Sequence, residues 1–126
     1  MLLIGSRALN YRLGYEHRSP ADWDFVCTYE EYEEFIKNLK RTETIKACYP
    51  IHAGRYIVCK TDKSICEFEI AWEGSSAEEL LQLAEEEVGT HFGVSNTDIS
   101  GQWDIPSLDL LYALKLSHRY KKNSPH

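Results

Sequence analysis

Hydrophobic and polar residues alternate along several short segments of this chain. Such alternation predicts β-strands, because successive side chains of a strand point to opposite faces of a sheet. The segment Asp22–Thr28 is the clearest case, with two aspartates on one face and a tryptophan, a phenylalanine and a cysteine on the other. The strands expected on this basis are Leu2–Ile4, Asp22–Thr28, Ile45–Tyr49, Arg55–Thr61 and Ile65–Trp72, with the third and fourth forming a hairpin.

Apolar residues at helical spacing predict helices between these strands. Thr28 is the expected N-cap of the second helix, and Glu31, three residues later, completes a capping box. Ser6 and Ser107 are the expected caps of the first and last helices. In the third helix we expect Leu80, Leu81, Leu83 and Ala84 to face inward, while 89–101 reads as a loop. The expected helices are Arg7–Leu13, Tyr29–Lys40, Ala77–Glu87 and Leu108–Tyr120.

The order of these elements predicts the fold class. Strands and helices that alternate in this way favour an α+β fold, in which helices flank a mixed β-sheet. A chain of 126 residues has the length of one domain. We therefore expect residues 1–126 to form a single domain.

Composition and charge narrow the class of protein. Apolar residues make up 43% of the chain and charged residues 27%, which is typical of a globular protein rather than a disordered one. No apolar run reaches the ~20 residues that span a bilayer, and the apolar start of the chain is too short for a signal peptide. We therefore expect a cytoplasmic protein with no membrane contact. The net charge of −6 argues against a broad surface for DNA phosphates.

The cysteines favour a reduced interior rather than a metal site or a disulfide framework. No two of them have the C-x-x-C spacing of zinc sites and redox motifs. A free cysteine in an apolar strand behaves as a small hydrophobic residue. We expect all four to be reduced and to lie in or near the core: Cys27, Cys48, Cys59 and Cys66.

Two short motifs combine residue types that bind phosphate and metal ions. Gly5-Ser6 follows a buried strand and opens a helix, where free backbone N–H groups attract anions. Asp22 and Asp24 lie on one face of a strand, where two carboxylates can hold one or two divalent cations. Arg7 flanks this region and is a further candidate for a phosphate contact, as is Arg12 in the same helix.

A third carboxylate can come from a later strand. Glu67 and Glu69 alternate there with apolar residues, and carboxylates in such a strand are costly unless they bind something. Of the two we favour Glu69, because Phe68 and Ile70 flank it.

This arrangement resembles the DNA polymerase β-like nucleotidyltransferase superfamily. The family's signature is an apolar strand ending in Gly-Ser, a spacer, an Asp-x-Asp flanked by apolar residues, and an acidic residue on a later strand. A helix follows the catalytic sheet in that family, and here a similar one opens after Pro106 and carries Lys115. The matching segments are Leu3-Ile4-Gly5-Ser6, Asp22-Trp23-Asp24-Phe25, Cys66-Glu67-Phe68-Glu69-Ile70 and Ile105-Pro106-Ser107-Leu108.

The resemblance implies an enzyme that moves a nucleoside monophosphate from a nucleoside triphosphate to an acceptor hydroxyl and releases pyrophosphate. The implied acceptor is a small molecule, a protein or a short RNA. Many members continue into an acceptor-binding helical domain, so we expect either a homodimer or the N-terminal part of a longer protein. The implied roles are nucleotide binding by Gly5, Ser6, Arg7 and Lys115, binding of Mg²⁺ or Mn²⁺ by Asp22, Asp24 and Glu69, and catalysis by these carboxylates with Glu67.

Two other hypotheses stay open. The chain could be a catalytically silent domain of the same fold that acts as a binding or interaction module. It could also be an unrelated α+β domain whose acidic strand residues are only solvated. Trp72 and Trp103 could stack on a base, although core packing is the expected role of both.

Overall fold

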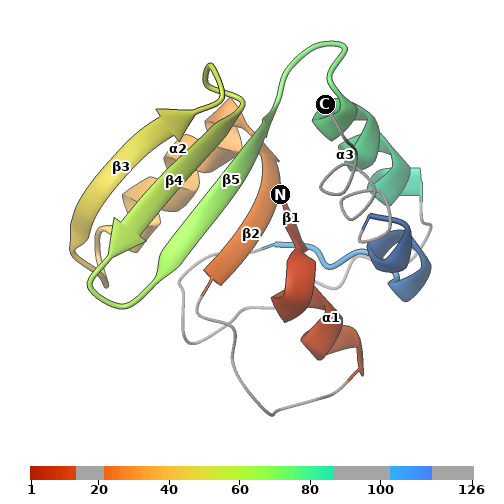
Figure 1. Cartoon of the computed structure of the whole chain (residues 1–126), viewed down its shortest axis with the longest axis horizontal. Helices are drawn as coiled ribbons and strands as arrows, with labels where there is room; N and C mark the ends of the chain where they lie inside the picture. The colour runs from red at the N-terminus through yellow and green to blue at the C-terminus, as the bar shows by residue number, and fades with distance from the viewer. Residues whose placement is uncertain (14–21, 87–102, 115–126) are drawn as a thin grey trace, which may run out of the picture.

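The computed structural model describes residues 1–13, 22–86 and 103–114, and Figure 1 traces the chain through them. The fold is α+β with a mixed sheet, as predicted, and the described strands lie close to their expected bounds. The strands are β1 (Leu2–Ile4), β2 (Asp22–Thr28), β3 (Ile45–Ile51), β4 (Tyr56–Thr61) and β5 (Ile65–Ala71). The helices are α1 (Gly5–Leu13), α2 (Tyr29–Leu39) and α3 (Ser76–Glu86), and residues 108–114 are also helical.

The sheet has the strand order β1-β2-β5-β4-β3. Its central pair, β2 and β5, is parallel, and every other pair is antiparallel. A parallel pair requires a long crossover, which here runs through α2 and the β3–β4 hairpin. The expected hairpin is confirmed, although β3 continues through Pro50 to Ile51. The expected loop over 89–101 and the expected continuation of the last helix over 115–120 lie outside the described residues.

One face of the sheet carries an aromatic core that α2 covers. Phe25 stands at its centre, with ring centroids 5.0 Å from Phe35 on α2, 5.5 Å from Phe68 on β5 and 5.6 Å from Trp103. In Figure 1, α2 crosses behind β3 and β4 on this side. Trp103 is buried, as expected of a core residue. We call this side the α2 face.

The opposite side, which we call the carboxylate face, is covered in part. α3 and β1 bury Val26 at the end of β2 in a second, smaller cluster with Leu2, Ala77 and Leu80. Further along the same face, Asp22 on β2 and Glu67 on β5 are exposed. α3 therefore covers the part of this face around Val26 and leaves Asp22 and Glu67 open to solvent.

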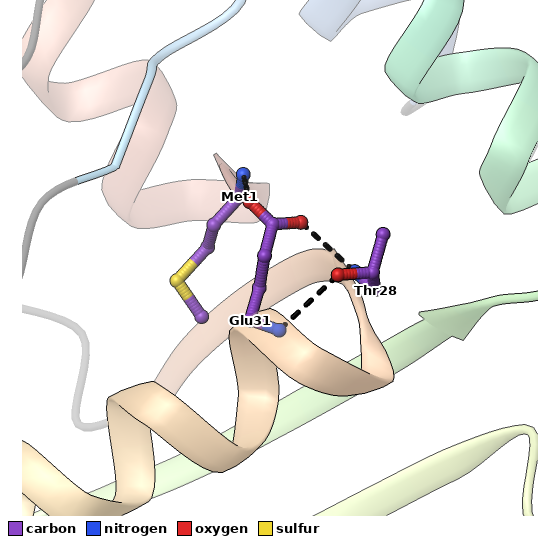
Figure 2. A network of polar contacts seen from close by, with 3 residues as sticks. All are labelled: Met1, Thr28 and Glu31. Carbon is purple, nitrogen blue, oxygen red and sulfur yellow. Dashed lines mark hydrogen bonds and ion pairs between the residues drawn. The ribbon is translucent and has the colours of Figure 1, made fainter.

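The capping box of α2 is confirmed. The backbone N–H of Glu31 donates to Thr28 Oγ1 at 3.1 Å, and the Thr28 N–H donates to Glu31 Oε1 at 2.9 Å. Figure 2 shows that the second carboxylate oxygen of Glu31 takes a 2.5 Å hydrogen bond from the N-terminal ammonium of Met1. One side chain thus joins the start of α2 to the start of β1. Ser107 is also confirmed as a cap, since its Oγ accepts from the Leu110 N–H.

Four local predictions were wrong. Ser6 is not an N-cap, because α1 already begins at Gly5. Leu83 is 46% exposed, since α3 turns only Ala77 and Leu80 fully inward. Trp72 is 53% exposed just past the end of β5. Cys48 is exposed because it lies on the edge strand β3, whereas the other three cysteines are buried and free as expected.

Candidate metal and nucleotide site

Asp24 and Glu67 are neighbours on the carboxylate face. The parallel register of β2 and β5 pairs their α-carbons, so both side chains leave the sheet on the same side. The local cause is the burial of Trp23 and Phe25 on the α2 face, which forces Asp24 to the opposite side. Cys66 and Phe68 orient Glu67 in the same way. The expected common face of the acidic residues on the two strands is confirmed.

The pair holds a proton near neutral pH. Burial is the largest cause, followed by the hydrogen bond and the negative charge of Glu67 and then the charge of Asp22, and together they raise the pKa of Asp24 to about 7. Two carboxylates that share a site cannot both ionise cheaply. Such a site gains from a cation, which would stabilise both carboxylates in their ionised form.

Gly5 provides the room for the Asp24 carboxylate. A Cβ added to Gly5 would come within 2.6 Å of Asp24 Oδ2, and the residue has a φ of +77°, in the left-handed region. Both facts require glycine at this position. The start of α1, whose first N–H groups have no partner within the helix, therefore lies directly against one carboxylate of the pair.

Asp22 and Glu69 lie on the same face but at opposite sides of this pair. Asp22 is exposed, two residues before Asp24, and pairs in register with Ile65. Glu69 pairs in register with Val26, and its Oε1 accepts a 2.7 Å hydrogen bond from the Tyr56 hydroxyl on β4. The structure therefore brings Glu67 to Asp24 and engages Glu69 with Tyr56, whereas the sequence interpretation favoured Glu69 as the third ligand.

Tyr56 is a residue of this face that sequence reasoning missed. Antiparallel pairing of β4 with β5 places it directly opposite Glu69. Burial, together with the hydrogen bond to Glu69, raises the pKa of Tyr56 to about 12, so its hydroxyl stays protonated and donates. Nothing in the local sequence identifies this partner, because it depends on the register of two strands. The alternation of β4 alone predicts only which residues share its face.

The two arginines of α1 have structural contacts. The Arg7 guanidinium carbon lies 3.7 Å from the ring centroid of Trp23, which points to the α2 face, away from Asp24. Arg12 donates to the backbone carbonyls of Ile105 and Pro106 at 2.5 and 2.8 Å. Lys115, the remaining basic candidate, lies outside the described residues.

The donor chemistry of the pair fits Mg²⁺ or Mn²⁺. These ions prefer oxygen ligands, and Mg²⁺ is commonly held by one or two carboxylates together with substrate phosphates. Within residues 1–13, 22–86 and 103–114, no three side chains of His, Cys, Asp or Glu form a group that could hold a metal ion. The described residues thus supply a pair of carboxylates, with Asp22 next along β2, rather than a complete cage.

A cavity of about 270 Å³ lies elsewhere, near the N-terminal ammonium shown in Figure 2. None of the four acidic candidates lines it; its walls include Met1, Thr28, Glu31, Leu81 and Pro106. Burial opposes ionisation of Glu31 there, but the hydrogen bonds and charge of the Met1 ammonium and the Thr28 N–H outweigh it and hold the pKa below its usual range. The ion pair between the Met1 ammonium and Glu31 therefore forms part of one wall of this cavity. The cavity is separate from the Asp24–Glu67 pair.

Comparison with known proteins identifies a family. A model described as "Domain of unknown function (DUF7277)" matches residues 1–84 of the 126 residues, and the chain belongs to this family. The match covers all five strands and therefore both carboxylates of the pair. No curated protein matches the chain. Among the described residues, no helix is long and apolar enough to cross a membrane.

Proposed function

We propose that this protein is a metal-dependent nucleotidyltransferase with a nucleotidyltransferase-like fold. In the proposed reaction an acceptor hydroxyl oxygen bonds to the α-phosphorus of a nucleoside triphosphate. The bond from that phosphorus to the bridging oxygen breaks, and pyrophosphate leaves. The observation that carries the proposal is the Asp24–Glu67 pair, which lies beside the glycine that opens α1. Mg²⁺ or Mn²⁺ is the proposed cofactor.

The cost of the carboxylate pair supports a ligand-binding role. A half-buried aspartate whose pKa is raised to about 7 reduces stability at neutral pH. Carboxylates that serve only as solvent-exposed surface groups do not need to lie next to each other. Strongly perturbed carboxylates that lie together are typical of functional sites, because a bound cation removes their repulsion. When bound, Mg²⁺ would supply positive charge to the phosphates and to the leaving oxygen.

Each residue of the site has a proposed role. Asp24 and Asp22 would hold the cation, and Glu67 would complete the set or accept the proton of the acceptor hydroxyl. The backbone at Gly5 and Ser6 would contact the phosphates, since the start of a helix attracts anions. Glu69, which the Tyr56 hydroxyl orients, would contribute from two residues further along β5 than Glu67. A small molecule, a protein side chain or a short RNA is the proposed class of acceptor.

The test is transfer of label from nucleoside triphosphates radiolabelled at the α-phosphate. The full chain would be incubated with Mg²⁺ or Mn²⁺, each of the common triphosphates and a panel of acceptors, with pyrophosphate release measured in parallel. Asp24→Asn and Glu67→Gln should each lower the rate by about 10³-fold, equivalent to about 4 kcal/mol of transition-state stabilisation. The matched control is Glu34→Gln, which neutralises an exposed carboxylate on α2.

The outcomes separate the proposal from its main alternative. Label transfer that both site variants abolish and the control retains supports the enzyme. Binding of Mg²⁺ and nucleotide by the wild type, lost in Asp24→Asn but without transfer to any acceptor, supports a silent binding module of the same fold. If the wild type binds neither nucleotide nor cation, the acidic residues of β2 and β5 are ordinary solvent-exposed surface groups, and the proposal is wrong.

A further inference from the structure

Three cysteines form a row across neighbouring strands on the α2 face. Cys48 on β3 lies directly opposite Cys59 on β4, and Cys59 lies directly opposite Cys66 on β5. Directly opposed residues of antiparallel strands have α-carbons about 4.5–5.5 Å apart. This spacing falls within the range of about 4.4–6.8 Å that a disulfide spans. The row therefore contains two pairs of free thiols whose backbone geometry permits a bond.

Burial distinguishes the two pairs. Cys59 and Cys66 have no exposed surface, whereas Cys48 is exposed at the sheet edge. A polar oxidant in water therefore reaches Cys48 first. The Tyr32 hydroxyl lies 3.0 Å from Cys48 Sγ and holds this sulfur beside α2.

The two cysteines of the outer pair lie directly opposite each other, on the same face of the sheet. Burial, followed by the charge and the hydrogen bond of Cys48, raises the pKa of Cys59 to about 12. Cys59 therefore remains a thiol and is protected from direct oxidation, but its strand register places it opposite Cys48. The pair thus combines an accessible sulfur with a buried one behind it, which is the arrangement of a reacting and a resolving cysteine.

We propose that Cys48 and Cys59 are a peroxide-sensitive pair that forms an intramolecular disulfide, with Cys48 reacting first. The Cys48 thiolate attacks one oxygen of hydrogen peroxide, the O–O bond breaks, and Cys48 becomes a sulfenic acid as hydroxide leaves. Cys59 sulfur then attacks Cys48 sulfur, the S–O bond breaks, and the second hydroxide leaves with the Cys59 proton as water. The first hydroxide takes the proton that Cys48 released. The two thiols together lose two electrons and two protons, and the peroxide is reduced to water.

This modification site is independent of the nucleotidyltransferase proposal. The cysteine row lies on the α2 face, while Asp24 and Glu67 lie on the other side of the sheet. The new bond would tie the edge strand β3 to β4 and remove the hydrogen bond between Tyr32 and Cys48. Its formation does not require a bound nucleotide or cation.

The experiment exposes the full chain to a small excess of hydrogen peroxide, removes the peroxide with catalase, and counts free thiols in denaturant. The four thiols of the wild type should fall to two, and peptide mapping should join Cys48 to Cys59. Cys48→Ser should keep its remaining thiols. Cys59→Ser should accumulate a sulfenic acid on Cys48 that a dione probe captures.

Cys66→Ser is the matched control, because it also removes a buried thiol of the row but should still form the disulfide. The proposal is overturned if the wild type keeps all of its thiols, or if the bond joins Cys59 to Cys66. A bond only between molecules would overturn it as well. Because Cys48 is exposed, Cys48→Ser should fold normally, so the test does not depend on a buried substitution.

Discussion

The α-carbon of Gly5 lies against the carboxylate of Asp24, so close that a Cβ would come within 2.6 Å of Oδ2. This contact joins the first turn of α1 to β2, an interior strand of the sheet. Gly5 also has a φ of +77°, a left-handed conformation that glycine adopts readily because it has no Cβ. Adding one methyl group at Gly5 tests the importance of this contact.

We expect Gly5→Ala to lower the free energy of unfolding by about 2–3 kcal/mol, from backbone strain and displacement of Asp24. Urea unfolding measures the change. Gly54→Ala is the control, because Gly54 has a similar positive φ of +84° but nothing within 4 Å of its added Cβ. It should cost about 1 kcal/mol from strain alone. Equal losses at the two positions would show that the contact with Asp24 is unimportant.

Asp24 should make stability depend on pH. The pKa of Asp24 is raised from 3.8 to about 7 in the folded protein, so the native state binds an extra proton between these values. The contribution of Asp24 to stability is therefore greatest below about pH 4 and is lost as the pH rises through about 7. Asp24→Asn removes this loss and should make the protein more stable than the wild type at alkaline pH.

The measurement is urea unfolding of wild type and Asp24→Asn from about pH 4 to about pH 8. The difference in unfolding free energy should change by roughly 2 kcal/mol, about half of the full linkage value, because solvent still reaches the half-buried carboxyl. Glu34→Gln, at an exposed position on α2, should change little across the same range. A constant difference between wild type and Asp24→Asn would contradict the raised pKa.

The register predicts that Glu67 matters more than Glu69 for cation binding. We expect Glu67→Gln to weaken Mg²⁺-dependent nucleotide binding by at least about tenfold, because Glu67 is the direct neighbour of Asp24. Tyr56→Phe and Glu69→Gln should have smaller effects, since they change a hydrogen-bonded pair two residues further along β5 from Glu67. Isothermal titration measures the affinities. The reverse order would identify Glu69 as the third carboxylate, as the flanking residues suggested.

The capping box makes a separable contribution to folding. Thr28→Ala removes the hydroxyl that accepts from the Glu31 N–H and should lower the unfolding free energy by about 1 kcal/mol. Thr44→Ala makes the same chemical change at an exposed position outside a helix, and should have little effect. Thermal unfolding followed by circular dichroism measures both. A similar loss in the two variants would mean that the cap hydroxyl does not stabilise α2.

Glu31 should act in the opposite pH direction from Asp24. Its pKa is lowered in the folded protein, so its stabilising contribution is present above the unfolded pKa and is lost as the pH falls through the folded value. Glu31→Gln should therefore reduce stability at neutral pH, and this difference should shrink in acid. Because the side chain is 40% exposed, we expect less than about 1 kcal/mol from the charge.

Local sequence signals determined where the helices and strands lie, and which side chains of β2 and of β5 share a face. The alternation of acidic and aromatic residues in Asp22–Thr28 placed both aspartates on one face, and Thr28 with Glu31 marked the start of α2. These predictions were correct because each depends on residues within one turn or one strand. Ser6, Leu83 and Trp72 were predicted wrongly because helix entry and burial depend on packing against distant segments.

Tertiary structure alone decided which residues of different strands meet. The parallel register of β2 with β5 selected Glu67 as the neighbour of Asp24, and the antiparallel register of β4 with β5 paired Tyr56 with Glu69. The same registers aligned the three cysteines, and the edge position of β3 exposed one of them. A strand's own sequence specifies which side chains share its face. Which residues of the next strand those side chains meet depends on the register between the two strands. The turns, the core and the crossover through α2 set this register, because they join segments that are distant in sequence.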